Sequence, residues 1–193
     1  MDLRPDPRLH RHQRRLSKLI PIFRRIETAR LVLRPYKRTD LPHVPALIGD
    51  WEVARWLSRA PYPYTDADAR HWLGLSRRIR WWRRGLPYVI VRRDDGAVMG
   101  GIGVSFDDNE IGYWLGQPYW GQGYATEAVR AIAGYAFANF GLDHLWAGVM
   151  QGNERSCNVL QKAGFEWKGM RRYRLRHGEG DVLYYRLEPG VWS

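Results

Sequence analysis

The most informative part of this 193-residue chain is Glu110-Ile-Gly-Tyr-Trp-Leu-Gly-Gln-Pro-Tyr-Trp-Gly-Gln-Gly-Tyr-Ala-Thr-Glu-Ala128. Its first six residues predict a strand, and a helical pattern runs from about Gly123 to Phe140. The glycines between them let a ligand approach backbone N–H groups, and a helix start adds unpaired donors and a positive dipole end. The stretch therefore predicts a site for a phosphate or pyrophosphate, although the glycines alone fit a plain tight turn equally well.

Two familiar nucleotide-binding motifs fit this loop poorly. The run Gly121-Gln-Gly123-Tyr-Ala-Thr126 lacks the third glycine of the dinucleotide-binding fingerprint. Asp143 lies about 20 residues further on, but it stands at the start of the next predicted strand, whereas the ribose-binding acid belongs at that strand's far end. The Gly-Lys-Ser/Thr ending of a P-loop is absent from the stretch. The sequence therefore disfavours NAD chemistry and nucleotide hydrolysis.

Strands and helices alternate on both sides of this stretch. Upstream, the patterns predict a strand, two short helices, a longer helix and two strands over residues 31–36, 41–49, 50–58, 65–84, 87–91 and 97–104. Downstream of the 123–140 helix, they predict a strand, a helix and two strands over 143–150, 153–163, 165–175 and 182–187. Local signals mark several boundaries: a helix cap at Thr39-Asp40, a capping box of Thr65 with Asp68, a hairpin turn at Asp94-Asp95-Gly96 and a helix stop at Gly164. We expect an α/β (mixed α+β) domain over residues 21–193, with one central, mostly antiparallel mixed sheet flanked by helices.

The chain is strongly basic, with 31 Lys and Arg against 20 Asp and Glu and a formal net charge of +11. More than half of this excess lies within residues 1–25, and we interpret residues 1–20 as a basic N-terminal arm. Two arginine clusters follow, over residues 77–84 and 171–176. Such an excess suggests an acidic partner, which is a nucleic acid, an anionic membrane surface or a multiply charged small molecule.

Several classes of protein are excluded by composition. The single cysteine, Cys157, rules out a disulfide framework and a Cys-rich zinc site, and the six histidines show no metal-ligand spacing. We therefore expect no metal. No stretch of about 18 apolar residues is present, and charges interrupt the N-terminal region where a signal peptide would be apolar. We expect no membrane association and a cytoplasmic location.

The central stretch resembles the GCN5-related N-acetyltransferase (GNAT) superfamily, and most closely its RimJ/RimL-like branch. Gly123 and Ala125 match the last two small positions of the superfamily pattern Q/R-x-x-G-x-G/A, whereas Trp120 stands where Gln or Arg is usual. The run Tyr-Trp-Gly-x-Gly-Tyr-Ala-Thr-Glu-Ala is typical of this branch. The resemblance implies that the pyrophosphate of acetyl-CoA is held by backbone N–H groups of Gly121, Gln122, Gly123, Tyr124, Ala125 and Thr126.

A second match lies at the expected distance downstream. Residues 153–165, Asn-Glu-Arg-Ser-Cys-Asn-Val-Leu-Gln-Lys-Ala-Gly-Phe, resemble the family's N-x-x-[AS]-x-x-x-[YL]-x-K-x-G-F helix, and the likeness spans about residues 25–188. It implies β-like backbone pairing of Trp114 and Leu115 with the pantetheine arm. Asn153 is expected to contact the pantetheine or the substrate, and it is also a common helix N-cap.

The resemblance also suggests catalytic groups. Glu110 lies where this branch often carries a base that takes the amine proton, directly or through water. The tyrosine that many members use as general acid is replaced by Leu160, and Ser156, one helical turn earlier, is expected to donate to the sulfur of CoA. The alternatives are that Glu110 is a solvated edge residue and that Ser156 only packs near the cofactor.

Two hypotheses of different classes follow. The first is an N-acetyltransferase that moves acetyl from acetyl-CoA to a primary amine, either a protein N-terminus or a small-molecule amine, by direct attack. The second is a basic RNA- or ribosome-binding module without catalysis. The two combine if the basic arm docks the enzyme on ribosomal RNA beside a protein substrate. The sequence leaves the acceptor open and is compatible with a monomer or a homodimer.

Overall fold

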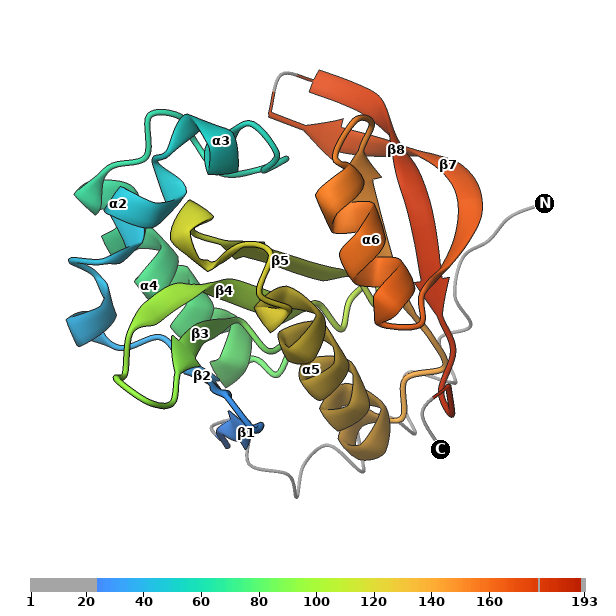
Figure 1. The fold of residues 1–193 in the computed structure, drawn as a ribbon, viewed down its shortest axis with the longest axis horizontal. Helices are drawn as coiled ribbons and strands as arrows, with labels where there is room; N and C mark the ends of the chain where they lie inside the picture. Colours follow the sequence, from blue (N-terminus) through green and yellow to red (C-terminus); the bar gives the residue numbers. More distant parts are fainter. Residues whose placement is uncertain (1–23, 177, 192–193) are drawn as a thin grey trace.

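The first of two sheets contains five antiparallel strands in the order β1-β2-β3-β4-β5 (Figure 1). The computed structural model describes residues 24–176 and 178–191, so the basic arm predicted over residues 1–20 lies outside it. The strands are Ile26–Glu27 (β1), Leu31–Pro35 (β2), Tyr88–Arg92 (β3), Val98–Val104 (β4) and Ile111–Leu115 (β5). The strands predicted for this sheet are confirmed to within one residue, and the two-residue β1 was missed.

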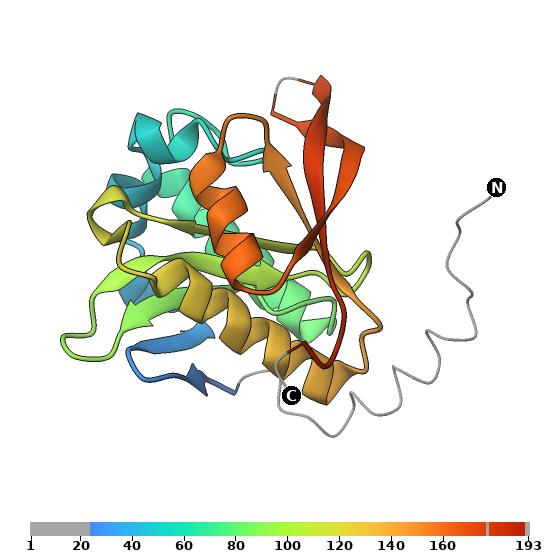
Figure 2. The ribbon, with the colours of Figure 1, turned by 45° about the vertical axis from the view of Figure 1, so that its right-hand side comes forward.

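The second sheet contains Leu145–Met150 (β6), Glu166–Leu175 (β7) and Gly178–Leu187 (β8), all antiparallel, in the order β6-β8-β7. One parallel bridge, between Glu110 and Trp146, joins it to the edge of the first sheet. Beyond this bridge β5 and β6 separate (Figures 1 and 2). The mixed α/β class with a central, antiparallel sheet flanked by helices is confirmed. The last three strands form a separate sheet, because the pairing between β5 and β6 stops after one bridge.

Helices cover both faces of the first sheet. One face carries Val44–Ile48 (α2), Trp51–Ala54 (α3) and Asp66–Trp81 (α4), and the other carries Tyr124–Phe140 (α5) (Figure 1). Alternation along β3 shows this, since Ile90 packs in the cluster that contains α5, whereas Val89 and Val91 pack in the cluster that contains α2 and α4. The last helix, Glu154–Lys162 (α6), lies between α5 and β7 (Figure 2).

The predicted helix starts are partly confirmed. Thr65 and Asp68 form the expected capping box of α4, with the Asp68 carboxylate accepting from the Thr65 N–H at 2.8 Å. Asp40 was expected to cap the next helix, but its carboxylate instead accepts two hydrogen bonds from the Arg34 guanidinium, at 2.7 and 2.8 Å. Helix α2 begins later, with Pro45 in its first turn, where a missing N–H costs no hydrogen bond.

Candidate active site

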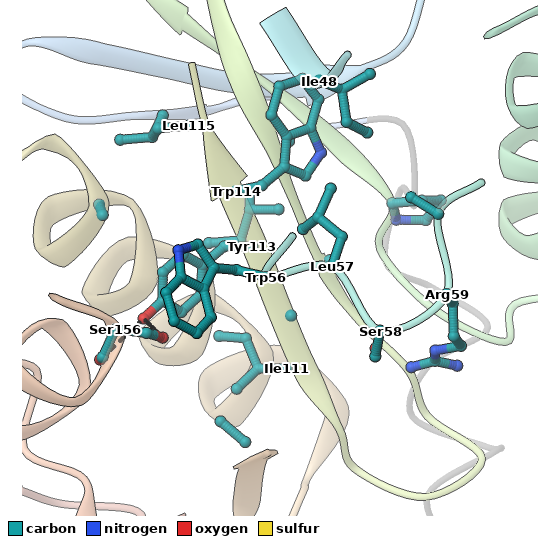
Figure 3. Close-up of a pocket in the computed structure, with 18 of the residues that line it drawn as sticks. Ile48, Trp56, Leu57, Ser58, Arg59, Ile111, Tyr113, Trp114, Leu115 and Ser156 are labelled. Carbon is teal, nitrogen blue, oxygen red and sulfur yellow. Dashed lines mark hydrogen bonds between the residues drawn. The ribbon is translucent and has the colours of Figure 1, made fainter. Parts of the chain in front are cut away.

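A cleft of about 1220 Å³ opens between β5 and β6, where the two strands separate. Its walls come from both strands, from the start of α5, from α6 and from the loops around α3 and α4. Figure 3 shows part of this cleft, with Tyr113 and Ser156 close together on one side and Arg59 on the other. The sequence-predicted residues that line it are Glu110, Trp114, Leu115, Gly121, Gly123, Ala125, Thr126, Asn153 and Ser156.

Two predicted residues do not line the cleft. Gln122 turns its side-chain amide to the Pro118 carbonyl, to which it donates at 3.0 Å. Tyr124, the first residue of α5, is buried in the core, with the Arg30 guanidinium 4.5 Å from the centroid of its ring. Only their backbone groups therefore remain as candidate ligands, which is the role that the resemblance assigned to them.

The hydrogen bonds of β5 show which of its backbone groups face the cleft. The Gly116 N–H donates to the Met99 carbonyl, and the Glu110 carbonyl accepts from the Ser105 N–H. Backbone direction alternates along a strand, so the even-numbered residues of β5 point toward β4. Trp114 is one of them. Its backbone belongs to the sheet, which corrects the expectation that it pairs with a pantetheine arm.

The odd-numbered residues of β5 point to the open edge. Leu115 keeps its N–H for a ligand, but its carbonyl accepts a hydrogen bond from the Trp120 indole N–H at 2.8 Å. Tyr113, which sequence reasoning missed, presents both of its backbone groups to the same edge. The strand alternation of Glu110–Leu115 was the signal that could have found it. An extended, amide-bearing ligand can therefore pair with this edge of β5.

The glycine loop before α5 forms a backbone cradle. Gly121 and Gly123 have φ values of +73° and +80°, a region that glycine adopts without a steric penalty. The Glu127 N–H donates to the Gly123 carbonyl at 3.1 Å, which is the first bond of the helix ladder. The N–H groups of residues 124–126 therefore lie ahead of the ladder, and an anion is the ligand that suits them.

Arg30 fixes this loop from the other end of the sequence. Its guanidinium donates to the Gln122 carbonyl at 2.9 Å and to the Glu127 carboxylate at 2.7 Å. Thr28 donates to the second oxygen of the same carboxylate at 2.6 Å. Burial disfavours the charged form of Glu127, but these hydrogen bonds outweigh it and hold the pKa of Glu127 below its usual range. The cradle is thus tied to the turn between β1 and β2, a link that sequence spacing does not reveal.

Glu127→Gln is expected to lower the free energy of unfolding by about 1–2 kcal/mol at pH 7, since it weakens hydrogen bonds to a charged group. A depressed folded-state pKa stabilises the protein above the unfolded value of about 4.3, and this stabilisation is lost as the pH falls through the folded value. The stability gap between wild type and variant should therefore shrink as the pH falls below about 4.3. Urea unfolding of both proteins at pH 7, 5 and 3.5 measures it, and a gap independent of pH would contradict the charge-based account.

Glu110 lies at the bridge where the two sheets meet. One carboxylate oxygen accepts from the Tyr173 hydroxyl at 2.5 Å, and the other accepts from the Arg59 guanidinium at 2.6 Å. The Glu110 side chain is only 11% exposed. Burial, reinforced by the hydrogen bond to Glu110, raises the pKa of Tyr173 above its usual range, so the phenol stays a donor. Glu110 is therefore a held carboxylate that faces the cleft and not a solvated edge group.

Ser156 lies across the cleft, in the first turn of α6. Asn153 caps this helix, since its side-chain oxygen accepts from the Ser156 N–H at 3.1 Å. The Ser156 hydroxyl lies 2.9 Å from the Tyr113 hydroxyl. Leu160, one turn further, is fully buried in the core. Asn153 thus acts as the N-cap through its side-chain oxygen. The NH2 group of the same amide stays available to donate to a ligand in the cleft.

Arg155 brings a positive charge to the glycine loop. Its guanidinium lies 4.7 Å from the centroid of the Trp120 ring, and both residues line the cleft next to Gly121. Trp120 occupies the motif position where Gln or Arg is usual, so the stacked Arg155 supplies from α6 a cation that the loop itself lacks. Sequence reasoning missed Arg155 because the contact joins two elements.

The two arginine clusters partly serve the fold. The Arg176 guanidinium donates to the carbonyl groups of Ala54 and Leu57, which ties the end of β7 to α3 and the loop after it. Arg84 pairs with Asp107 at 2.6 Å. These arginines therefore do not form one free basic surface.

Two absences hold for residues 24–176 and 178–191. Within those ranges, the His, Cys, Asp and Glu side chains form no group of three that could bind a metal ion. None of the helices described there combines the length and apolar character needed to cross a bilayer.

Comparisons with known proteins agree with this architecture. The acetyltransferase (GNAT) domain family matches residues 30–166. YoaA of Bacillus subtilis, named as an uncharacterized N-acetyltransferase, is 29% identical over 81% of this chain and 92% of its own length. RimJ of Mycobacterium smegmatis, solved with CoA-disulfide, superimposes with a TM-score of 0.74 at 20% identity, over 84% of this chain and 83% of its own. The ribosomal-protein-S5-alanine acetyltransferase of Vibrio fischeri gives 0.73 at 18% identity, over 88% and 99%. The chain therefore belongs to the GNAT acetyltransferase family.

Proposed function

We propose that this chain transfers an acetyl group from acetyl-CoA to a primary amine by direct attack of the amine on the thioester. One observation carries the proposal. A single cleft joins the backbone cradle before α5, the open edge of β5, the Ser156 hydroxyl and the Glu110 carboxylate. A ligand with phosphates at one end, amides along its length and a reactive group at the other end fits this order of sites.

The donor half of the cleft has groups for each part of acetyl-CoA. The N–H groups of residues 124–126 suit the pyrophosphate, and the charge on Arg155 supports them. The Leu115 N–H and the backbone of Tyr113 suit the pantetheine amides. The thioester then lies near Ser156, beyond the edge of β5 that pairs with the pantetheine. Structural relatives solved with CoA support this assignment, since they share the fold.

The acceptor half brings the base to the reaction. Glu110 takes a proton from the attacking nitrogen, directly or through a water molecule. The nitrogen bonds to the thioester carbon, the C–S bond breaks, and its electron pair stays on sulfur. Ser156 donates a hydrogen bond to that sulfur as charge develops on it. The amine proton leaves through Glu110, and the thiolate is finally protonated from solvent.

Calorimetric titration of the full chain with acetyl-CoA tests the donor half. Binding in the micromolar range is expected, and no heat at near-millimolar cofactor would overturn the proposal. Turnover against a panel of amines then identifies the acceptor. A peptide with a free N-terminus is the first amine to test, because ribosomal-protein acetyltransferases share this fold. Small-molecule amines and polyamines form the other arms of the panel.

Arg155→Ala is expected to weaken acetyl-CoA binding about threefold to tenfold, as an exposed charge contact contributes about 1 kcal/mol. The turnover number should change less than twofold, because Arg155 stacks on Trp120 at the phosphate end of the cleft. Titration and steady-state kinetics measure the two effects. Arg130→Ala is the matched control, since Arg130 donates to the Lys162 carbonyl at the far end of the same helix and does not line the cleft. Equal losses in both variants would place Arg155 outside the site.

A further inference from the structure

The hydroxyl groups of Tyr113 and Ser156 meet in the cleft. Their oxygens lie 2.9 Å apart, and either hydroxyl can donate to the other. The Tyr113 hydroxyl also donates to the Ser156 carbonyl, at the longer distance of 3.2 Å. Both residues line the cleft, one from β5 and the other from α6 (Figure 3). The mechanism proposed above uses the serine hydroxyl and leaves the tyrosine hydroxyl without a role.

A serine hydroxyl carries one hydrogen, and its direction decides what the group can do. If Ser156 donates to Tyr113, no hydrogen is left for a ligand. If Tyr113 donates to Ser156, the serine hydrogen is free to point elsewhere. The two Ser156 oxygens lie on the same side of the Tyr113 hydroxyl, so its hydrogen can be shared between them, with Oγ the nearer acceptor. Burial raises the pKa of Tyr113 above its usual range, so the phenol keeps this hydrogen. The second arrangement leaves the serine hydrogen available to the cleft.

We propose that Tyr113 is a positioning residue that donates to the Ser156 oxygen and thereby directs the Ser156 O–H at the leaving sulfur. This inference rests on the proposed acetyl transfer. When the C–S bond breaks, the electron pair remains on sulfur and the Ser156 O–H stabilises the thiolate by a hydrogen bond. No proton leaves Tyr113. Its hydrogen bond also makes the Ser156 O–H a stronger donor, because linked hydrogen bonds polarise one another.

The placement of these residues explains how a buried leucine can occupy position 160. That side chain is fully buried, so it presents no polar group to the cleft. Ser156 lies one helical turn before this leucine on α6, and the Tyr113 hydroxyl reaches it from β5. These two hydroxyls supply the polar group that the leucine lacks. The donor to sulfur is thus assembled from β5 and α6 together.

Tyr113→Phe, Ser156→Ala and the double variant test the inference as a cycle. Tyr113→Phe should lower the turnover number about tenfold and change the KM for acetyl-CoA less than twofold, since it removes one hydrogen bond worth about 1.4 kcal/mol in the transition state. Ser156→Ala should lower it at least as much. The double variant should match Ser156→Ala, because Tyr113 acts only through the serine.

Tyr185→Phe is the matched control. Tyr185 is a buried phenol on β8 that contacts Cys157, the next residue of α6, and it does not line the cleft. This variant should keep the wild-type turnover number. Losses that multiply in the double variant, or an unchanged rate in Tyr113→Phe, would overturn the inference while wild-type turnover stands. A wild type that binds no acetyl-CoA would overturn the proposed function itself, and the inference with it.

Discussion

Gly123→Val is expected to weaken acetyl-CoA binding at least 100-fold. Gly123 has a φ of +80°, which a β-branched residue rarely adopts, so the loop must change its path. The new side chain would also stand beside the N–H groups of residues 124–126, with its Cβ about 3.5 Å from the Arg30 guanidinium. Losing two hydrogen bonds to a charged phosphate removes about 3 kcal/mol, which corresponds to roughly 100-fold in affinity.

Gly96→Val separates backbone strain from blocked binding. Gly96 has a φ of +72° in the turn between β3 and β4, and no atom lies within 4 Å of its added Cβ. It does not line the cleft. Both variants should lose similar stability in thermal unfolding, but only Gly123→Val should lose acetyl-CoA in calorimetric titration. A Gly123→Val protein that binds with wild-type affinity would show that the cradle lies elsewhere.

The elements of this fold could be predicted because their signals are local. The capping box of Thr65 and Asp68, the turn at Gly96 and the glycine stop after α6 each depend on residues close together in sequence. The separation of β5 from β6 could not be predicted, because both strands have ordinary strand patterns. It depends on pairing between residues 36 positions apart, at Glu110 and Trp146, and on where that pairing ends.

The candidate site was predictable where a motif runs along the chain. Gly123 and Ser156 belong to such motifs, and both line the cleft. Residues that act from other elements carry no motif. Arg30 reaches the glycine loop across more than 90 positions, and Tyr173 reaches Glu110 across 63. The sequence also leaves open which residues of β5 turn their backbone N–H and C=O groups to the open edge. Trp114 was therefore expected in the role of pairing with the pantetheine, for which Tyr113 is placed.

The basic character of the chain has a structural explanation in part. Arg176 and Arg84 bond to backbone or to an acid within the fold. Arg155 lies on the cleft, next to the glycine loop. Net charge alone therefore overestimates the surface that is free for an acidic macromolecule, because some arginines serve packing and others serve the proposed cofactor site.

Glu110→Gln is expected to lower the turnover number about 100-fold to 1000-fold, the range for removal of a general base. Glutamine has nearly the same shape, so it can keep a hydrogen bond from the Tyr173 hydroxyl and leave the wall of the cleft in place. It cannot take a proton from the attacking amine. Affinity for acetyl-CoA should change less than twofold, because the carboxylate lies at the acceptor end of the cleft. Steady-state kinetics at saturating cofactor and calorimetric titration measure the two effects.

Two further variants show whether the loss is catalytic. Asp107→Asn removes an exposed carboxylate three residues away, paired with Arg84, and should keep the wild-type rate. Arg59→Gln removes the cation that holds Glu110 but leaves the base, so its loss should be smaller, within about tenfold. If Glu110 only anchored Arg59, the two substitutions would reduce the rate equally. An unchanged rate in Glu110→Gln would exclude this carboxylate as the base. A large loss in Glu110→Gln, with small losses in the other two variants, is the result expected if Glu110 takes the amine proton.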